Sequence, residues 1–159
     1  MAQGISLNQF APNNPIDGMY VYQANLPQLH NVIVSTAQTT ALQSGAFVTI
    51  DTTSTNTNAP VVKQAGVTDK VFGVLTFNPV KNQWGAGERI AIARANDIIF
   101  KTAAGVITAG SDVYFTTDNT VTATATAGNT IIGTAITPSL AEGDLIQVQL
   151  HFEQTAAGE

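Results

Sequence analysis

Polar and apolar residues alternate along most of this chain, and the clearest run is residues 144–153. Successive side chains of a β-strand point to opposite faces, so an alternation of period two indicates a strand with one buried face. One face of this run carries Ile146, Val148, Leu150 and Phe152, and the other carries Gln147, Gln149, His151 and Glu153. We expect a half-buried strand here.

Shorter runs of the same kind recur along the chain and are rich in β-branched and aromatic residues. Each is bounded by Gly, Pro, Asn or Asp, which favour turns. The expected strands are residues 19–24, 32–35, 46–50, 71–78, 89–95, 98–101, 113–116, 120–126 and 130–137. Only residues 36–44 leave room for a helical turn or two. The pattern predicts an all-β fold, a compact β-barrel or β-sandwich.

Three groups of positions recur in the same order in the two halves of the chain. Their offsets are 65, 60 and 56 residues, which fits two copies that keep their strands and differ in loop length. The matched sets are Leu42, Gly45, Val48 and Ile50 with Ile107, Gly110, Val113 and Phe115; residues 71–74 with 131–134; and residues 87–92 with 143–148. Two repeated β-units explain these matches, and chance similarity in a sequence rich in Thr, Gly and Val is the alternative.

The beginning of the chain differs from the rest. Residues 1–29 contain three prolines and several asparagines, and their only charged residue is Asp17. We therefore expect an extended N-terminal arm over residues 1–35, a β-domain over residues 36–153 and a flexible tail over residues 154–159. The repeat halves of the β-domain are about 40–100 and 101–153. Two interpretations of the arm stay open: a disordered leader, or a segment that orders on a neighbouring surface.

Aromatic and large apolar residues on such an arm are typical anchors to a partner. Trp84, the only tryptophan, is predicted to lie in a loop over residues 79–87. A tryptophan in a loop either contacts a partner or is buried as an anchor of the loop. The candidate contact residues are Phe10, Tyr20, Tyr22, Leu26, Leu29 and Trp84.

The amino-acid composition argues against some classes of partner. Only 11% of residues are charged, with six Lys plus Arg against eleven Asp plus Glu, while 22 Thr and 12 Asn supply uncharged polar surface. A net charge of −5 without a basic cluster opposes nucleic-acid binding, so we expect no nucleic acid as a partner. The most apolar stretch, residues 90–100, is interrupted by polar residues, and we expect no membrane partner.

Two further features of composition concern the cell compartment. The chain has no cysteine, which excludes disulfide scaffolds, thiol catalysis and cysteine-ligated zinc, and which fits synthesis in a reducing cytosol. The first cationic residue is Lys63, so no basic leader for export is expected.

The sequence shows no ionisable groups that converge on a catalytic or metal site. His30 and His151 lie far apart, and neither has the spacing of a metal-binding motif. Glu88 and Asp144 follow a turn glycine at equivalent places in the repeat, where a carboxylate accepts backbone N–H bonds and closes the turn. The acidic candidates for a glycosidase or calcium site are Asp112, Asp118, Glu142 and Asp144. We expect structural roles for them, and no catalytic residue, cofactor or metal.

Three stretches of the second half carry a resemblance to a known family. They are Thr108-Ala109-Gly110-Ser111-Asp112-Val113-Tyr114, Ile132-Gly133-Thr134-Ala135 and Glu142-Gly143-Asp144-Leu145-Ile146-Gln147-Val148-Gln149-Leu150. Their composition and order resemble the tailed-bacteriophage capsid decoration proteins, or structural cement proteins, over about residues 40–152. Residues 1–29 are longer and richer in Asn and Pro than that pattern.

The resemblance implies a non-enzymatic viral protein of the virion, made in the host bacterial cytoplasm. It further implies a place on the outer surface of the phage head, the major capsid protein as partner, and a homotrimer that stabilises contacts between capsid subunits. The candidate contact residues would then dock on the capsid or on a neighbouring subunit, for example by adding a strand to an exposed sheet edge.

Two other functions remain as alternatives. A β-sandwich binding module of a phage fibre or of a carbohydrate-binding protein would present several exposed aromatic residues on one face. The sequence offers only Tyr22, Trp84 and Tyr114 for that face. An enzyme is the least favoured hypothesis, because the sequence shows no group of catalytic residues.

Overall fold

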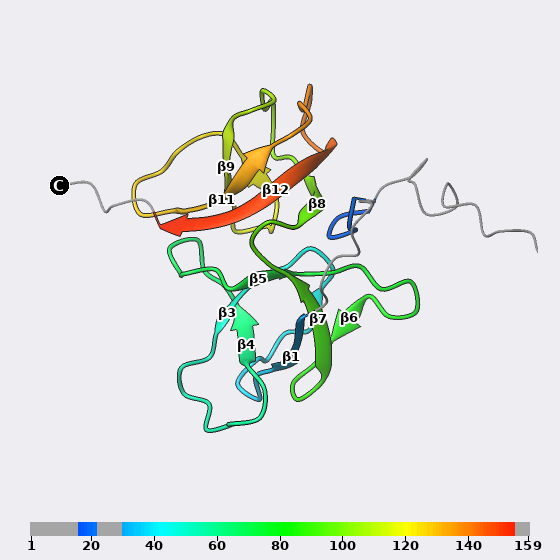
Figure 1. Ribbon diagram of the computed structural model, residues 1–159, viewed down its shortest axis with the longest axis vertical. Helices are drawn as coiled ribbons and strands as arrows, with labels where there is room; N and C mark the ends of the chain where they lie inside the picture. Colours follow the sequence, from blue (N-terminus) through cyan, green and yellow to red (C-terminus); the bar gives the residue numbers. More distant parts are fainter. Residues whose placement is uncertain (1–15, 22–29, 155–159) are drawn as a thin grey trace, which may run out of the picture.

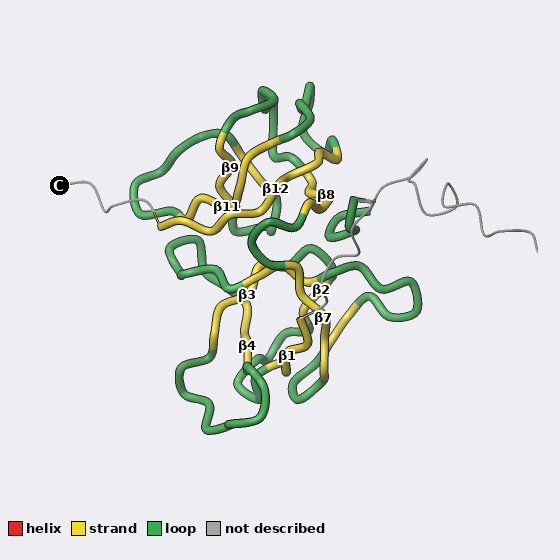
Figure 2. Tube along the Cα trace, viewed as in Figure 1, coloured by secondary structure: helices red, strands yellow, loops and turns green. Residues whose placement is uncertain are grey.

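The computed structural model describes residues 16–21 and 30–154, and within them the chain forms strands, turns and loops but no helix. The all-β prediction is confirmed, and the fold includes a closed barrel (Figure 1). Figure 2 shows two strand-rich bodies, one above the other along the long axis of the molecule. We call residues 30–93 the first unit and residues 98–154 the second unit.

The first unit is the closed barrel with a small additional sheet. Its strands are β1 (His30–Val34), β2 (Leu42–Gln43), β3 (Phe47–Ile50), β4 (Val61–Gln64), β5 (Gly73–Leu75), β6 (Gln83–Trp84) and β7 (Arg89–Ala93). Five of them close the barrel in the order β1-β4-β3-β5-β7, with β1 parallel to β4 and antiparallel to β7. β2 and β6 pair with each other and form a separate two-stranded sheet. Closure leaves none of the five barrel strands with an unpaired edge.

The second unit repeats this strand order. Its strands are β8 (Ile98–Thr102), β9 (Asp112–Phe115), β10 (Val121–Thr122), β11 (Thr130–Ala135) and β12 (Leu145–Gln154), in the order β10-β9-β11-β12-β8. A parallel bridge between Ala103 and Val121 links the two ends of this sheet, where β1 pairs with β4 in the first unit. A bridge between Ile107 and Ser139 stands where β2 pairs with β6. The two units therefore share one topology, as the sequence repeat predicted.

Glycines at equivalent positions of the two units have the same packing role. A Cβ atom on Gly73 in β5 would lie 2.7 Å from the carbonyl oxygen of Ala93. One on Gly133 in β11 would lie 2.1 Å from the carbonyl oxygen of Gln149. Both distances are too short for a carbon atom, so the neighbouring strand approaches each unit's central strand at a place that only glycine leaves open.

Several strand boundaries differ from the sequence prediction. β4 was not predicted, because its four residues lack a clear alternation. Residues 36–44 contain no helix and contribute β2 instead. Of the expected strand 120–126 only β10 forms, since the alanine and threonine side chains of residues 123–126 are exposed and bury no apolar face. The range 1–35, expected as an arm, contains β1, which is a strand of the barrel.

Two clusters of buried apolar residues form the core. One fills the barrel interior and includes Leu42, Trp84 and Ile92. The other fills the second unit and continues into the first, so that Phe47 of β3 packs against Phe115 of β9 with ring centroids 4.7 Å apart. Burial of apolar surface stabilises such contacts by roughly 25 cal/mol per Å². The shared cluster joins the two units into one body.

Candidate functional site

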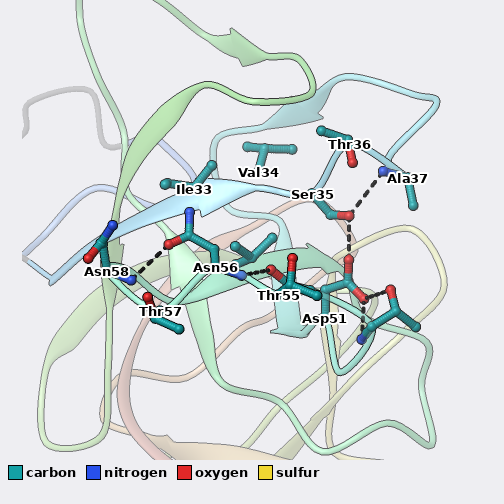
Figure 3. Close-up of a pocket in the computed structure, with 13 residues that line it drawn as sticks. Ile33, Val34, Ser35, Thr36, Ala37, Asp51, Thr55, Asn56, Thr57 and Asn58 are labelled. Atoms are coloured by element: carbon teal, nitrogen blue, oxygen red, sulfur yellow. Dashed lines mark hydrogen bonds between the residues drawn. The ribbon is translucent and has the colours of Figure 1, made fainter.

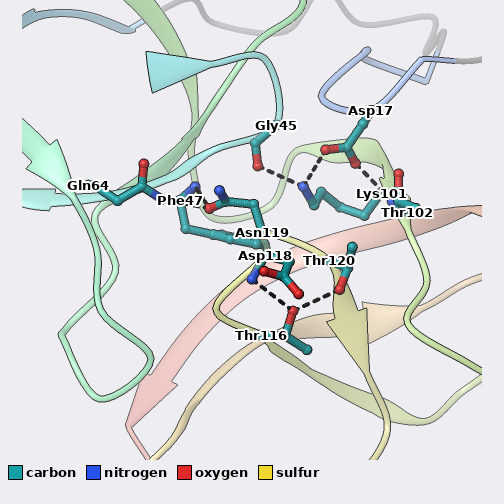
Figure 4. A network of polar contacts seen from close by, with 10 residues as sticks. All are labelled: Asp17, Gly45, Phe47, Gln64, Lys101, Thr102, Thr116, Asp118, Asn119 and Thr120. Carbon is teal, nitrogen blue, oxygen red and sulfur yellow. Dashed lines mark hydrogen bonds and ion pairs between the residues drawn. The ribbon is translucent and has the colours of Figure 1, made fainter. Parts of the chain in front are cut away.

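The most enclosed charged group of the described chain lies where the two units meet. Lys101, in β8, has no solvent-exposed surface. Its ammonium Nζ donates to Asp17 Oδ2 at 2.8 Å and to the carbonyl oxygen of Gly45 at 2.7 Å, and it lies 4.6 Å from the ring centroid of Phe47 (Figure 4). Burial lowers the pKa of Lys101, and the carboxylate of Asp17 partly opposes this shift. The network joins the N-terminal segment to both units.

We call residues 16–21 the strap, because they lie along the outer edge of β8. Gly18 N donates to Phe100 O at 2.8 Å, Phe100 N to Met19 O at 2.7 Å, and Val21 N to Ile98 O at 3.0 Å. Asp17 Oδ1 also accepts a bond from Thr102 N at 2.8 Å. The strap therefore extends the sheet of the second unit by a short antiparallel segment of the same chain.

The strap also fits closely against the first unit. Gly18 has φ +80°, and a Cβ atom there would lie 2.6 Å from Gly45 N and 2.7 Å from Leu75 O. Phe77 N donates to Gly18 O at 3.1 Å. A left-handed backbone in so narrow a space requires glycine. The position of the strap is thus fixed by contacts with both units.

A second polar contact between the units centres on Asn119, in the turn between β9 and β10. Asn119 has φ +61°, a conformation that asparagine adopts more readily than most residues. Its Oδ1 accepts bonds from Gln64 Nε2 at 2.8 Å and from Phe47 N at 3.3 Å (Figure 4). The hydroxyls of Thr116 and Thr120 lie 2.7 Å apart at the base of the same turn. The turn at Asp118 and Asn119 therefore also anchors the second unit on the first.

A polar pocket of about 490 Å³ opens at the end of the barrel between β1 and the loop after β3 (Figure 3). Asp51 lies in its wall and is 6% exposed. Asp51 Oδ2 accepts a bond from the Ser35 hydroxyl at 2.5 Å, and Oδ1 accepts bonds from the hydroxyl of Thr53 at 2.7 Å and its amide at 3.0 Å. These donors lower the pKa of Asp51 to about 2. A carboxylate already satisfied by such donors stays ionised and holds the loop in place.

Glu88 and Asp144 close equivalent turns, as the sequence predicted. Glu88 Oε2 accepts a bond from Gly85 N at 2.6 Å and its other oxygen pairs with Lys81. Asp144 Oδ2 accepts bonds from Leu140 N at 2.8 Å and Ala141 N at 2.9 Å. These bonds lower the pKa of both carboxyl groups. Both carboxylates therefore stabilise the turns that they close.

The histidines do not come together. His30 lies in β1, while His151 lies in β12 with Nε2 at 2.9 Å from the Thr134 hydroxyl and 3.9 Å from Asp112. In residues 16–21 and 30–154, no group of three or more histidine, aspartate or glutamate side chains is arranged to hold a metal ion. The same ranges contain no helix of the length and apolarity that a membrane crossing needs.

The candidate contact residues fall into two groups. Phe10, Tyr22, Leu26 and Leu29 lie outside the described residues. Tyr20 lies in the strap, where its hydroxyl donates to Asp97 Oδ2 at 3.3 Å, and burial and that carboxylate raise its pKa. Trp84 was expected in a loop over residues 79–87, but it lies in β6 and pairs with Leu42 of β2. Its side chain is 6% exposed and packs in the core of the first unit, so it is a buried anchor.

The sequence did not predict the buried Lys101 network. Lys101 is the only charged residue of β8, and strand alternation puts it on the same face as buried Ile99. That was the available signal for a buried cation. Its partner Asp17 is 84 residues away, and no local pattern connects the two.

Comparison with known proteins gives a match over most of the chain. The family model described as structural cement protein (E217 gp24/Pam3 gp6) matches residues 17–151. A solved structure of the head fiber gp8.5 N base in bacteriophage phi29 is similar with a TM-score of 0.53 and 12% identity, over 78% of this chain and 93% of that chain. At that identity the likeness concerns the fold alone. No curated protein matches this chain.

The family match begins at Asp17 and ends at His151, so it covers nearly all of the strap and of both units, together with the Lys101 network. It also covers all three stretches on which the sequence resemblance rests. The chain belongs to the phage structural cement protein family and is a structural protein of the phage capsid.

Proposed function

We propose that this protein binds the outer surface of the phage head and stabilises contacts between major capsid protein subunits. The observation that carries the proposal is the combination of the family match with a two-unit body fixed by the buried Lys101 network. A rigid body loses little conformational entropy on binding, so more of its contact energy is available to hold its partners together.

The mechanism is mechanical and involves no catalysis. A protein that binds only the assembled state stabilises that state by mass action. Several contacts on one molecule act at high effective concentration once the first has formed, so individually weak contacts give a stable complex. Threonine, asparagine and alanine on the contacting surface have a lower desolvation cost than lysine or glutamate.

We propose a homotrimer as the bound form and the N-terminal arm as an additional contact. In the described residues the strap already occupies the outer edge of β8 in its own chain. The contacts proposed for the capsid or a neighbouring subunit are therefore those of Phe10, Tyr22, Leu26 and Leu29. Synthesis in the host bacterial cytoplasm and the division into arm, β-domain and tail belong to the same proposal.

Cosedimentation with expanded empty capsids tests this function. We expect saturable binding at a fixed ratio of cement protein to capsid subunit, and binding to unexpanded procapsids serves as the comparison. Light scattering of the free protein at increasing concentration measures whether it forms trimers. Failure to bind either form of the shell would contradict the proposal.

A fibre module is a second candidate, because the structural neighbour is the N base of a head fibre. That likeness supports a shared fold. Retention on a glycan column without capsid binding would favour a carbohydrate-binding module instead.

A further inference from the structure

A shallow apolar groove with two cations runs along the junction of the two units. It has a volume of about 520 Å³. Ile50 and Phe72 of the first unit and Phe152 of the second supply apolar surface, and Lys70 and Arg94 supply the charge. Ile50 is 36% exposed, which makes it one of the few large hydrophobic residues at the surface of the described chain. The groove therefore combines two features that a partner can recognise.

The Arg94 guanidinium is held in place by stacking. Its central carbon lies 4.1 Å from the ring centroid of Phe72. Stacking on an aromatic face leaves the in-plane N–H groups of a guanidinium available, and their fork matches a carboxylate in two parallel hydrogen bonds. The side chain is thus positioned for a carboxylate ligand.

The acidic groups near the groove have other partners. Asp97 accepts bonds from the Arg94 backbone amide and from Tyr20, Asp69 accepts one from Gly66 N, and Glu153 lies 3.9 Å from His151 Nδ1. Among the described residues, no carboxylate forms an ion pair with the side chain of Lys70 or Arg94. Both charges are therefore available to a partner.

Free cations are scarce on this protein. Of its six lysines and arginines, Lys101 is buried against Asp17 and Lys81 pairs with Glu88. Two of the remaining four line this one groove. A local positive charge beside apolar surface, on a chain with net charge −5, is complementary to a segment that is acidic and apolar.

We propose that this groove binds an extended acidic segment of the capsid subunit, with a carboxylate on Arg94 and Lys70 and a large apolar side chain against Ile50 and Phe152. The proposal rests on the proposed function for the identity of the partner. In this contact the carboxylate pairs directly with the two cationic side chains, and the attraction between the charges weakens as the salt concentration rises.

Charge reversal at matched positions tests the groove. Arg94→Glu and Lys70→Glu are compared with Arg89→Glu, which changes the charge equally on an exposed β7 residue outside the groove. In cosedimentation with expanded empty capsids, each groove variant is expected to weaken binding about tenfold, and Arg89→Glu less than about twofold. Arg94→Lys keeps the charge but loses the two-bond geometry, so we expect an intermediate loss.

The salt dependence gives an independent readout. Increasing NaCl concentration is expected to weaken wild-type binding more steeply than that of the groove variants, because they have lost the attraction that salt screens. Thermal unfolding of each variant checks that it is folded. Groove variants that are folded and bind capsids with wild-type affinity and salt dependence would overturn the proposal.

A second experiment tests ligand binding in the groove independently of the proposed capsid function. If the wild-type protein binds no capsid, the capsid function fails, and the groove is judged by NMR titration with a synthetic peptide of alternating glutamate and phenylalanine. Saturable shifts at the Arg94 side chain and the Phe72 and Phe152 rings, lost in Arg94→Glu but kept in Arg89→Glu, support the groove. Absence of such shifts overturns it.

Discussion

The Nζ atom of Lys101 lies 2.8 Å from the Oδ2 atom of Asp17, although 84 residues separate them in the chain. Lys101 is in the second unit, Asp17 is in the strap, and the same ammonium also bonds to the carbonyl of Gly45 in the first unit. A buried charge is tolerated when it is paired and costs several kcal/mol when its partner is removed. The ion pair therefore adds a buried polar link between the strap and both units to the apolar cluster that they share.

Removing the anion of this pair is expected to destabilise the protein. Asp17→Asn should lower the free energy of unfolding by about 2 kcal/mol, because the Lys101 ammonium stays buried without its anion. The loss is smaller than for a fully buried pair, because the Asp17 side chain is 25% exposed. Lys101→Met replaces the cation by an apolar side chain and is expected to cost less. Urea unfolding measures both. A loss in Asp17→Asn no larger than in Lys101→Met would contradict this account.

The in-strand glycines predict a matched pair of variants. Gly133→Ala should lower stability by about 1–3 kcal/mol, because its methyl group would clash with the backbone of β12. Gly105→Ala is the control, since no atom lies within 4 Å of the Cβ position there. Its effect should stay within about 0.5 kcal/mol. Thermal or urea unfolding measures the stability of both variants. Equal effects of the two substitutions would contradict the close approach of β12 to Gly133.

The Asp51 carboxylate predicts a stability that depends on pH in the acid range. Its pKa is about 2 in the folded protein, below the ordinary value of 3.8, so its stabilising contribution is present above about pH 4 and is lost as the pH falls towards 2. Asp51→Asn should therefore be less stable than wild type at about pH 6, and the gap should narrow as the pH approaches 2. Urea midpoints across this range test it. A gap that stays constant would show that the carboxylate is not the cause.

Variants of Trp84 distinguish a buried core residue from a direct contact with a partner. Trp84→Ala should lower stability by about 3–5 kcal/mol, because it empties a large volume in the barrel core. Trp84→Phe should fold and bind expanded capsids as well as the wild type does, since the side chain serves the core. Loss of capsid binding in a folded Trp84→Phe protein would instead indicate a direct contact.

The sequence predicted those features that have a local signature. The alternation of residues 144–153 predicted β12, and the repeated glycines and acids predicted the equivalent turns at Glu88 and Asp144. The run over residues 120–126 was overestimated because alternating threonine and alanine have the period of a strand but little apolar surface to bury. A local pattern therefore predicts a strand only where one face of the segment has enough apolar side-chain surface to bury.

Contacts between distant segments had no such signature. The bond between Lys101 and Asp17 depends on the strap lying along β8. The groove beside Arg94 is lined by Phe152 from the second unit and Phe72 from the first. These pairs are set by the packing of the two units. Periodicity within a window of ten residues contains no information about them.

The function proposed for this protein is to stabilise an assembled phage capsid. Calorimetry of expanded empty capsids with increasing amounts of the protein tests it most directly. We expect the disassembly temperature of the shell to rise with added protein and to reach a plateau at a fixed ratio to capsid subunits. A shell whose disassembly temperature stays the same when it is saturated with the protein would contradict it.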